Sequence, residues 1–398
     1  MASAMACSSD VPVRHDWVYR FDSDDARRCG ISYAHMCNLE AFTYRGEAVV
    51  AAAFQCSGAG AEGGDSQHLR FATSRDAGAT WSDARCVMWG LNALWSPILH
   101  YDASAGVLHL FYSESRKARS PGGDVKCLTS VDAGETWSDV VRTVYTHEAD
   151  GGVPKVLANK LIVVDDEWIL PFWREPVDSW IEYQHYHPLQ ENEQGREPRP
   201  DIAPLGLASP PESREGSAGV LISRDRGVTW EAHGRVRDDA TWLIENTLCE
   251  IAQDKSLVML FRTGTGRVYR SISTDRGKNW TSATPTSLPN PNSKVGMTCV
   301  HVPGTEKRSD ADTSPSKETT TKLIVAYNAS QRHRAPLHVA TSEDGGDTWT
   351  DAAVLEADPT GNFAYPTPIA VDADGGGVDV MVGYSVWGQG IRVATFRM

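Results

Sequence analysis

The chain has 398 residues, enough for two or three compact domains or for one large repeat architecture. Its formal net charge of -14 and isoelectric point near 5.3 argue against nucleic acids and anionic membranes as partners, because both select a basic surface. The sequence has no long uncharged apolar run, and the start MASAMACSSDVPVRHDW has no basic region followed by an apolar stretch. We therefore expect a cytoplasmic protein without membrane insertion.

Residues that bind metals are not grouped in the sequence. The eight cysteines are scattered without CxxC pairs or metal-ligand spacing, which is typical of buried free thiols. His185 and His187 lie close together, but they open a stretch rich in Pro, Gly, Glu and Gln. We expect neither a metal nor a cofactor.

An eight-residue turn occurs five times along the chain. Its pattern is Ser-x-Asp-x-Gly-x-x-Trp, and the copies are SRDAGATW (74–81), SVDAGETW (130–137), SRDRGVTW (223–230), STDRGKNW (273–280) and SEDGGDTW (342–349). In such a turn Asp accepts backbone N–H groups, Gly supplies a positive φ and Trp buries a large ring. Each copy is predicted to connect two strands of a sheet.

Three short β-type segments precede each turn, and a sixth set of three ends the chain. Their length, their β-branched and aromatic content and their Gly, Asp and Asn boundaries indicate strands. The predicted strands are 36–42, 49–54 and 69–73; 97–101, 107–112 and 125–129; 161–164, 168–172 and 218–222; 248–251, 257–261 and 268–272; 297–302, 323–327 and 337–341; and 366–371, 378–384 and 391–396.

This repetition predicts an all-β, six-bladed β-propeller that forms a single domain over residues 1–398. The last unit has no turn of its own, and we expect the N-terminal segment around Trp17 to Phe21 to supply its outer strand. Residues 182–217 contain few β-formers and are predicted to be a loop insertion within the third blade. Residues 304–321 and 115–124 are two further polar excursions.

Propeller geometry also locates a candidate site. The start of each innermost strand and the end of the strand beside it share one face of the central channel. The residues at these positions are mostly polar, charged or aromatic: His35, Trp95, Asn159 with Lys160, Glu245, Gly296 and Tyr365 at strand starts, and Arg174, Arg262 and Asn328 at strand ends, with Arg334 just beyond. This concentration on one rim predicts a binding or catalytic site.

The five turns resemble the Asp boxes of the sialidase (neuraminidase) superfamily, and the likeness covers nearly the whole chain. Glu245 in IENTLCEI and Arg262 in LFRT resemble the family's Glu and the second arginine of its carboxylate-binding triad. Arg334 in RAPLHVATSEDGGDTW is similar to the third arginine, and Tyr365 in NFAYPTPI to the family's tyrosine. Asp65 in AEGGDSQHL resembles the aspartate that acts as general acid and base.

The resemblance implies a chemistry that these residue types suit. The tyrosine is the nucleophile and the glutamate is its base, which a phenol needs because its pKa is near 10. A carboxyl such as Asp65 can act as general acid when its pKa is raised by enclosure. Arg262 and Arg334 would bind a substrate carboxylate through their planar forks. Lys160, Arg174, Trp95 and Asn328 are further candidate substrate-binding residues on the same rim.

The first blade departs from the family pattern. His35 in YAHMCNL stands where sialidases carry the first arginine of the triad. The HMCNL, ANKLIV and WILPFWRE segments resemble a divergent sialidase-like branch that includes uronate-directed lyases and exo-rhamnosidases. There a histidine can remove a proton next to a carboxylate while a cation stabilises the enolate.

Three functions therefore remain open from the sequence. The first is a glycoside hydrolase of exo-α-sialidase type that acts on a carbohydrate with a terminal acidic sugar. The second is a uronate-directed lyase or exo-rhamnosidase that uses His35. The third is a propeller that binds glycan or protein through the same rim without catalysis.

Overall fold

The computed structural model describes residues 11–58, 62–64, 66–115, 122–175, 216–303, 319–373 and 376–398. The 182–217 insertion lies outside the described residues apart from its last two positions, and so do most of the two other polar excursions. The described part is almost entirely β-structure, with one short helix, α1 (Asp24–Cys29). The predicted all-β class is confirmed.

Hydrogen bonding groups the strands into five sheets. Four of these sheets have four strands each: β2 (Tyr33–Tyr44), β3 (Glu47–Ser57), β4 (His68–Ser74) and β5 (Arg85–Met88); β15 (Ile244–Glu250), β16 (Leu257–Arg262), β17 (Arg267–Ser273) and β18 (Thr284–Pro289); β19 (Gly296–Pro303), β20 (Thr319–Asn328), β21 (Leu337–Ser342) and β22 (Thr350–Glu356); and β23 (Phe363–Asp372), β24 (Val378–Val386), β25 (Gly390–Arg397) and β1 (Arg14–Arg20).

The fifth sheet has nine strands: β6 (Leu94–Asp102), β7 (Val107–Ser115), β8 (Gly123–Ser130), β9 (Arg142–Tyr145), β10 (Lys155–Leu157), β11 (Ile162–Val164), β12 (Glu167–Arg174), β13 (Ser217–Ser223) and β14 (Glu231–Val236). Its two halves are joined by one residue pair, Lys155 with Gly123. The segment predicted as one inner strand at 161–164 is preceded by β10, and both β10 and β11 pair with β12.

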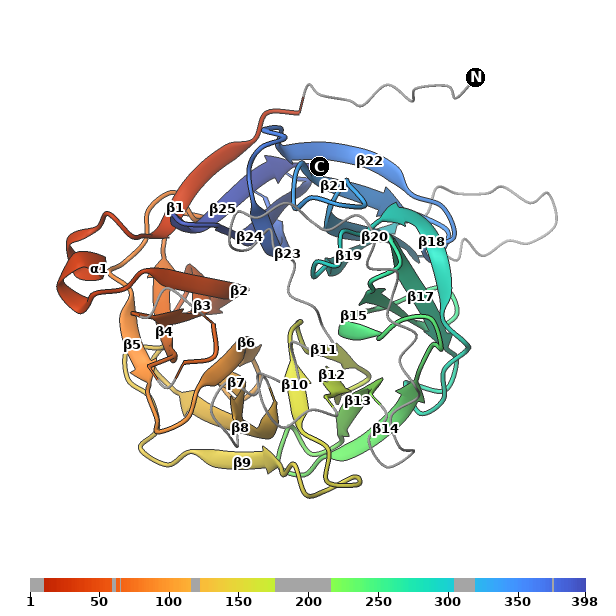
Figure 1. The fold of residues 1–398 in the computed structure, drawn as a ribbon, viewed down its shortest axis with the longest axis horizontal. Helices are drawn as coiled ribbons and strands as arrows, with labels where there is room; N and C mark the ends of the chain where they lie inside the picture. Colours follow the sequence, from red (N-terminus) through yellow and green to blue (C-terminus); the bar gives the residue numbers. More distant parts are fainter. Residues whose placement is uncertain are drawn as a thin grey trace.

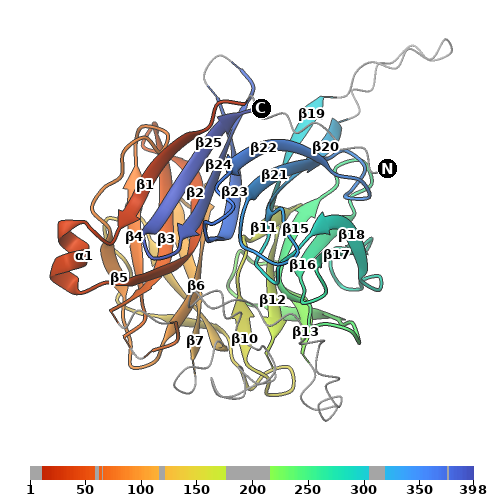
Figure 2. The ribbon, with the colours of Figure 1, turned by 45° about the horizontal axis from the view of Figure 1, so that its top comes forward.

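The sheets are arranged around a common centre, with β2, β6, β10, β15, β19 and β23 nearest to it and β5, β9, β14, β18, β22 and β1 on the perimeter (Figures 1 and 2). The N-terminal strand β1 pairs antiparallel with β25, so one sheet contains residues from both ends of the described chain. Hydrophobic clusters fill the space between neighbouring sheets and between the two halves of the nine-stranded sheet. One of them contains residues of β12, β13, β15, β16 and β23.

The five repeated turns share one set of hydrogen bonds. In the first copy Ser74 Oγ accepts from Gly78 N at 2.8 Å, and the Asp76 carboxylate accepts from Thr80 N at 2.9 Å. The Trp Nε1 donates to the Gly carbonyl in four copies. In the second copy Trp137 packs against Phe71 instead, with ring centroids 5.3 Å apart, and its Nε1 has no partner among the described residues.

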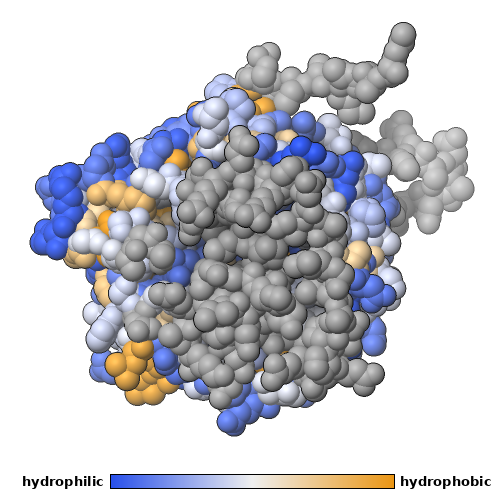
Figure 3. Space-filling model, in the orientation of Figure 1, coloured by the Kyte–Doolittle hydropathy of each residue, from blue (hydrophilic) through white to orange (hydrophobic). Residues whose placement is uncertain are grey.

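On the face seen in Figure 3, the described residues that are visible are mainly hydrophilic, with a few hydrophobic places among them. This is the surface expected for a chain with a net charge of -14. The only described helix, α1, is six residues long, so no helix in the described part has the length or apolarity to cross a membrane.

Candidate active site

Four of the strands nearest the centre carry the same backbone irregularity at the same place. In β2, β6, β15 and β23 the pairing register slips close to the strand start, and one residue there has a positive φ: Met36, Ser96, Glu245 and Tyr365, with φ between 50° and 58°. Such bulges turn a side chain away from its normal alternation, and a positive φ is costly for these residue types. The bulges place Glu245 and Tyr365 at equivalent positions of two strands.

The bulges also correct an expectation from the sequence. His35 and Trp95 were aligned with Glu245 and Tyr365 as strand starts, but they lie one residue earlier in their strands. Met36 shares the register position of Glu245 and Tyr365, and it packs in the same hydrophobic cluster as Tyr365.

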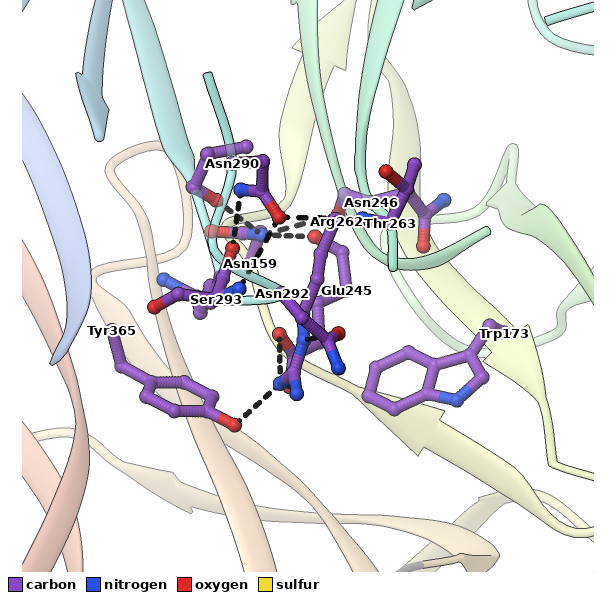
Figure 4. A network of polar contacts seen from close by, with 12 residues as sticks. Asn159, Trp173, Glu245, Asn246, Arg262, Thr263, Asn290, Asn292, Ser293 and Tyr365 are labelled. Carbon is purple, nitrogen blue, oxygen red and sulfur yellow. Dashed lines mark hydrogen bonds and ion pairs between the residues drawn. The ribbon is translucent and has the colours of Figure 1, made fainter. Parts of the chain in front are cut away.

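Arg262 joins Glu245 to Tyr365. Its Nη1 donates to both carboxylate oxygens of Glu245 at 3.0 Å and to the Tyr365 hydroxyl oxygen at 2.7 Å. All three side chains are buried, and Figure 4 shows Arg262 between Tyr365 and Trp173 with Glu245 beside it. The structure therefore brings these three residues together, with the arginine as the link.

The surroundings of Tyr365 oppose its ionisation. Burial raises the pKa of the phenol, and the charge of Glu245 raises it further, while Arg262 and Arg334 act in the opposite direction. The Arg334 guanidinium carbon lies 5.3 Å from the Tyr365 ring centroid, and its side chain is buried. A phenol in this setting reacts as a nucleophile only when a base such as Glu245 takes its proton.

His35 lies against Tyr365 on the side of the first sheet. The two ring centroids are 4.1 Å apart, and the rings of Tyr33 and Trp387 lie at 5.8 and 5.9 Å from His35. Its Nδ1 is 2.7 Å from Ser385 Oγ, and its Nε2 has no partner among the described residues. Burial, with Arg334, Lys294 and Arg262 nearby, lowers the pKa of His35 well below its ordinary value. His35 is therefore neutral at pH 7 and does not supply the charge of an arginine.

Asparagine side chains hold the site's backbone. Asn159 Nδ2 donates to the carbonyl of Glu245 at 2.9 Å and also reaches the carbonyls of Asn246 and Val295. Asn292 Oδ1 accepts from Arg262 Nε at 2.8 Å. The bulge that presents Glu245 and the direction of the Arg262 side chain are thus fixed by amides from other segments (Figure 4).

Two basic residues predicted on the rim are engaged elsewhere. Lys160 Nζ forms an ion pair with Glu40 and donates to the carbonyls of Leu39 and Leu99, so it ties neighbouring strands together. Arg174 forms an ion pair with Asp150 and donates to the Gly234 carbonyl at 3.0 Å. Both residues therefore use their donors on partners other than Glu245 and Tyr365.

The remaining predicted residues are placed as follows. Trp95 is buried and donates from Nε1 to Ser115 Oγ at 2.6 Å. Asn328 is buried at the end of β20 and donates to the carbonyl of Phe363, close to Tyr365 in sequence. Asp65 lies outside the described residues.

Sequence reasoning missed two charged residues near the site. Glu62, three residues before Asp65, accepts from Gln55 Nε2 at 3.0 Å, and its charge contributes to the raised pKa of Tyr365. Lys294 in LPNPNSKVG is buried, with its Nζ on the backbone that follows Tyr365. Only the carboxylate-rich sequence AEGGD gave a signal for the first; nothing in the sequence distinguishes the second from a solvated lysine.

The site contains the groups that acid–base chemistry on an anionic ligand requires. It combines a buried phenol, a carboxylate, two guanidinium groups and a neutral imidazole, and the described residues contain no group of three or more His, Cys, Asp or Glu side chains that could hold a metal ion. Arginine forks suit a carboxylate, and the phenol and carboxylate suit nucleophile and base.

A comparison with models of known protein families shows which family this chain belongs to. The BNR repeat-like domain family matches residues 47–380, most of the chain. The chain belongs to this family. A search of curated proteins finds no match for this BNR repeat-like chain.

Solved structures show the same fold. A protein of unknown function from Dyadobacter fermentans is 16% identical over 97% of this chain and 99% of its own, with a TM-score of 0.65. The Hadza microbial sialidase Hz136 is 16% identical over 92% of this chain and 66% of its own, with a TM-score of 0.64. The intramolecular trans-sialidase from Ruminococcus gnavus, in complex with oseltamivir carboxylate, is 12% identical over 96% of this chain and 97% of its own, with a TM-score of 0.61. At these identities the likeness establishes a sialidase-like fold for the BNR repeat-like chain.

Proposed function

We propose that this protein is a glycoside hydrolase of exo-α-sialidase type that acts on a terminal acidic sugar. The observation that carries the proposal is the contact of one guanidinium nitrogen, Arg262 Nη1, with both the Tyr365 hydroxyl and the Glu245 carboxylate. The sheets around the centre are then six blades of a single propeller domain, and residues 182–217 are an insertion in the third blade. The match to solved sialidases supports this architecture.

The reaction has two steps. In the first, Glu245 takes the phenolic proton, Tyr365 Oη forms a bond to the anomeric carbon, and the bond to the leaving group breaks as Asp65 protonates the departing oxygen. In the second, water attacks the anomeric carbon, its proton passes to Asp65, and Tyr365 leaves and recovers its proton from Glu245. The sugar is released with retained configuration.

Arg262 and Arg334 bind the substrate carboxylate. Both guanidinium groups lie within 6 Å of the Tyr365 ring centroid, so a carboxylate held by them places the adjacent anomeric carbon near the nucleophile. Their positive charge also offsets the negative charge that Tyr365 and Glu245 share during proton transfer.

The test compares two substrates. Wild-type protein is incubated with a fluorogenic sialoside and with a rhamnosyl-glucuronide, while fluorophore release and the absorbance of an unsaturated uronate are followed. We expect fluorophore release from the sialoside, a loss of at least about a hundredfold in Y365F and R262A, and near wild-type turnover in Y112F. Tyr112 is a matched control because it is also a buried tyrosine but belongs to a different cluster. Absence of turnover of both substrates by wild-type protein would refute the enzymatic proposal for these classes.

His35 supports a second candidate, a uronate-directed lyase or exo-rhamnosidase. A neutral imidazole against Tyr365 is able to accept a proton next to a carboxylate, and the charges of Arg262 and Arg334 would stabilise the resulting enolate. If the protein is a lyase, the absorbance of the unsaturated uronate should grow with wild-type protein and should not grow with H35A. Lys160, a candidate substrate-binding residue from the sequence, forms an ion pair with Glu40. Turnover by neither route, with retained glycan binding, would favour a binding propeller.

A further inference from the structure

The backbone that follows Tyr365 is held by a lysine from the neighbouring sheet. Pairing between β23 and β24 runs from Ala364 with Ser385 directly to Thr367 with Gly383, so Tyr365 and Pro366 have no partner in the ladder. Lys294 Nζ donates to the Pro366 carbonyl at 2.7 Å and to Thr367 Oγ1 at 2.9 Å. The lysine therefore satisfies a carbonyl that the bulge leaves without a strand partner.

Burying the amine of Lys294 costs desolvation free energy, which indicates that its hydrogen bonds are needed at this place. Its side chain is buried, it forms no ion pair with any described residue, and its two acceptors are a carbonyl and a hydroxyl. Burial lowers the pKa of Lys294 to about 7, with the charge of Glu245 acting the other way. An aliphatic residue would avoid this desolvation, but it would leave the Pro366 carbonyl without a partner.

The segment around Lys294 is also connected to the other two members of the site, directly to Arg262 and through Asn159 to Glu245. Asn292 accepts from Arg262 Nε, and the Val295 carbonyl accepts from Asn159, whose amide also donates to the Glu245 carbonyl. Gly296 lets this segment approach the bulge, since a Cβ there would lie 2.3 Å from the Pro366 oxygen. The segment 292–296 thus contacts the side chain of the arginine and the backbone after the nucleophile directly, and it is linked to the backbone of the base through Asn159.

We propose that Lys294 is a positioning residue for Tyr365. By fixing the Pro366 carbonyl and the Thr367 hydroxyl, it holds the positive-φ conformation that directs the phenol toward Arg262 and Glu245. This inference rests on the proposed function of Tyr365 as nucleophile. A displacement of about 1 Å of such a group is enough to lower a rate about a hundredfold.

The test uses three variants of the bulge contact and a matched buried lysine. K294M removes both donated bonds and keeps the aliphatic length, T367V removes one acceptor, and T367S restores a hydroxyl. K155M is the control, because Lys155 is equally buried and donates to two carbonyls, those of His147 and Ala149, in a different sheet. Turnover of the fluorogenic sialoside gives kcat and KM for each.

A second readout follows Tyr365 without requiring activity. Protein labelled with 3-fluorotyrosine gives one fluorine resonance per tyrosine, and Y365F identifies that of residue 365. We expect K294M and T367V to shift this resonance and to lower kcat about 10- to 100-fold with KM within about threefold. T367S and K155M should retain the wild-type resonance and kcat within about twofold.

The two readouts separate the two hypotheses. An unchanged resonance and kcat in K294M and T367V, or equal effects in K155M, would overturn the role of Lys294. If K294M fails to fold, the pair T367V and T367S decides the same question. If wild-type protein does not turn over the sialoside, the proposed function fails, and the fluorine resonance alone still shows whether Lys294 positions Tyr365.

Discussion

At the scale of single residues, Arg262 has three tasks in the folded protein. It compensates the buried charge of Glu245, donates to the Tyr365 hydroxyl and, through Nε, is held by Asn292. Because the side chains of Arg262 and Glu245 are 6% and 7% exposed, each charge depends on the other for its solvation. Stability and function are therefore coupled at this residue.

Removing Arg262 alone should be more harmful than removing the pair. We expect R262M to lower the free energy of unfolding by about 3–5 kcal/mol, because Glu245 is left charged and buried. The double variant E245Q/R262M should lose less than the sum of the single variants, since neither charge remains. Urea denaturation of the four proteins measures the coupling, and additive losses would show that the ion pair contributes nothing.

Lys294 should give the stability a distinct pH dependence. Its pKa falls from an ordinary 10.5 to about 7 in the folded protein, so between these values the unfolded chain binds a proton that the folded chain does not. The contribution of Lys294 to the stability therefore rises with pH across this window, by at most about 1.4 kcal/mol per pH unit, and its burial penalty is fully present below pH 7. The free energies of unfolding of wild-type and K294M protein are measured by denaturation at pH 6.5, 8 and 9.5. As the pH rises, their difference should change in favour of the wild type. A constant difference would show that Lys294 remains protonated throughout.

At the scale of elements, the repeated turns also pack one sheet against the next. Gly134, in the second turn, has a φ of 87°, and a Cβ there would lie 2.3 Å from Phe71 of β4. Gly345 in the fifth turn has a similar φ of 71° but open space around it. The two glycines separate the cost of backbone strain from the cost of a collision between sheets.

We expect G134A to be the more destabilising of the two variants. Both alanines adopt an unfavourable φ, at a cost of about 1–2 kcal/mol, but only that at 134 adds overpacking of about 1–3 kcal/mol. Thermal or urea unfolding measures the difference. Equal losses would mean that Phe71 moves aside at no cost.

The bulges show where prediction from the sequence succeeded and where it ended. The sequence placed Glu245 and Tyr365 on the rim because each lies near the start of a strand that is nearest the centre. The extra residue of each bulge was not visible, so His35 and Trp95 were aligned one position away from their true register. Glu and Tyr have no intrinsic preference for a positive φ, so it cannot be predicted from the residue type. The surrounding contacts impose it.

At the scale of the whole molecule, the turns predicted the all-β class and the pairs of strands they connect, because their pattern is local. Contacts between distant segments were not predictable. Lys160 pairs with Glu40 and Lys294 bonds to Pro366, residues 120 and 72 positions away. Charged residues whose partners come from another sheet look the same in sequence as solvated ones.

The arrangement of the sheets around one centre brings Glu245, Arg262, Arg334 and Tyr365 together from three different sheets. Each of these residues lies near the end of a strand on the same face, so the fold itself assembles the site. A covalent sugar on Tyr365 is the most specific consequence of the proposed catalytic role of this site.

Covalent trapping measures this directly. Wild-type protein and Y365F are incubated with a fluorinated sialosyl donor that slows hydrolysis of the glycosyl-enzyme, then digested, and the peptides are analysed by mass spectrometry. We expect the mass of the sugar on the wild-type peptide that contains Tyr365 and on no peptide of Y365F. An unmodified Tyr365 peptide, or the sugar on another residue, would contradict the assignment of Tyr365 as the nucleophile.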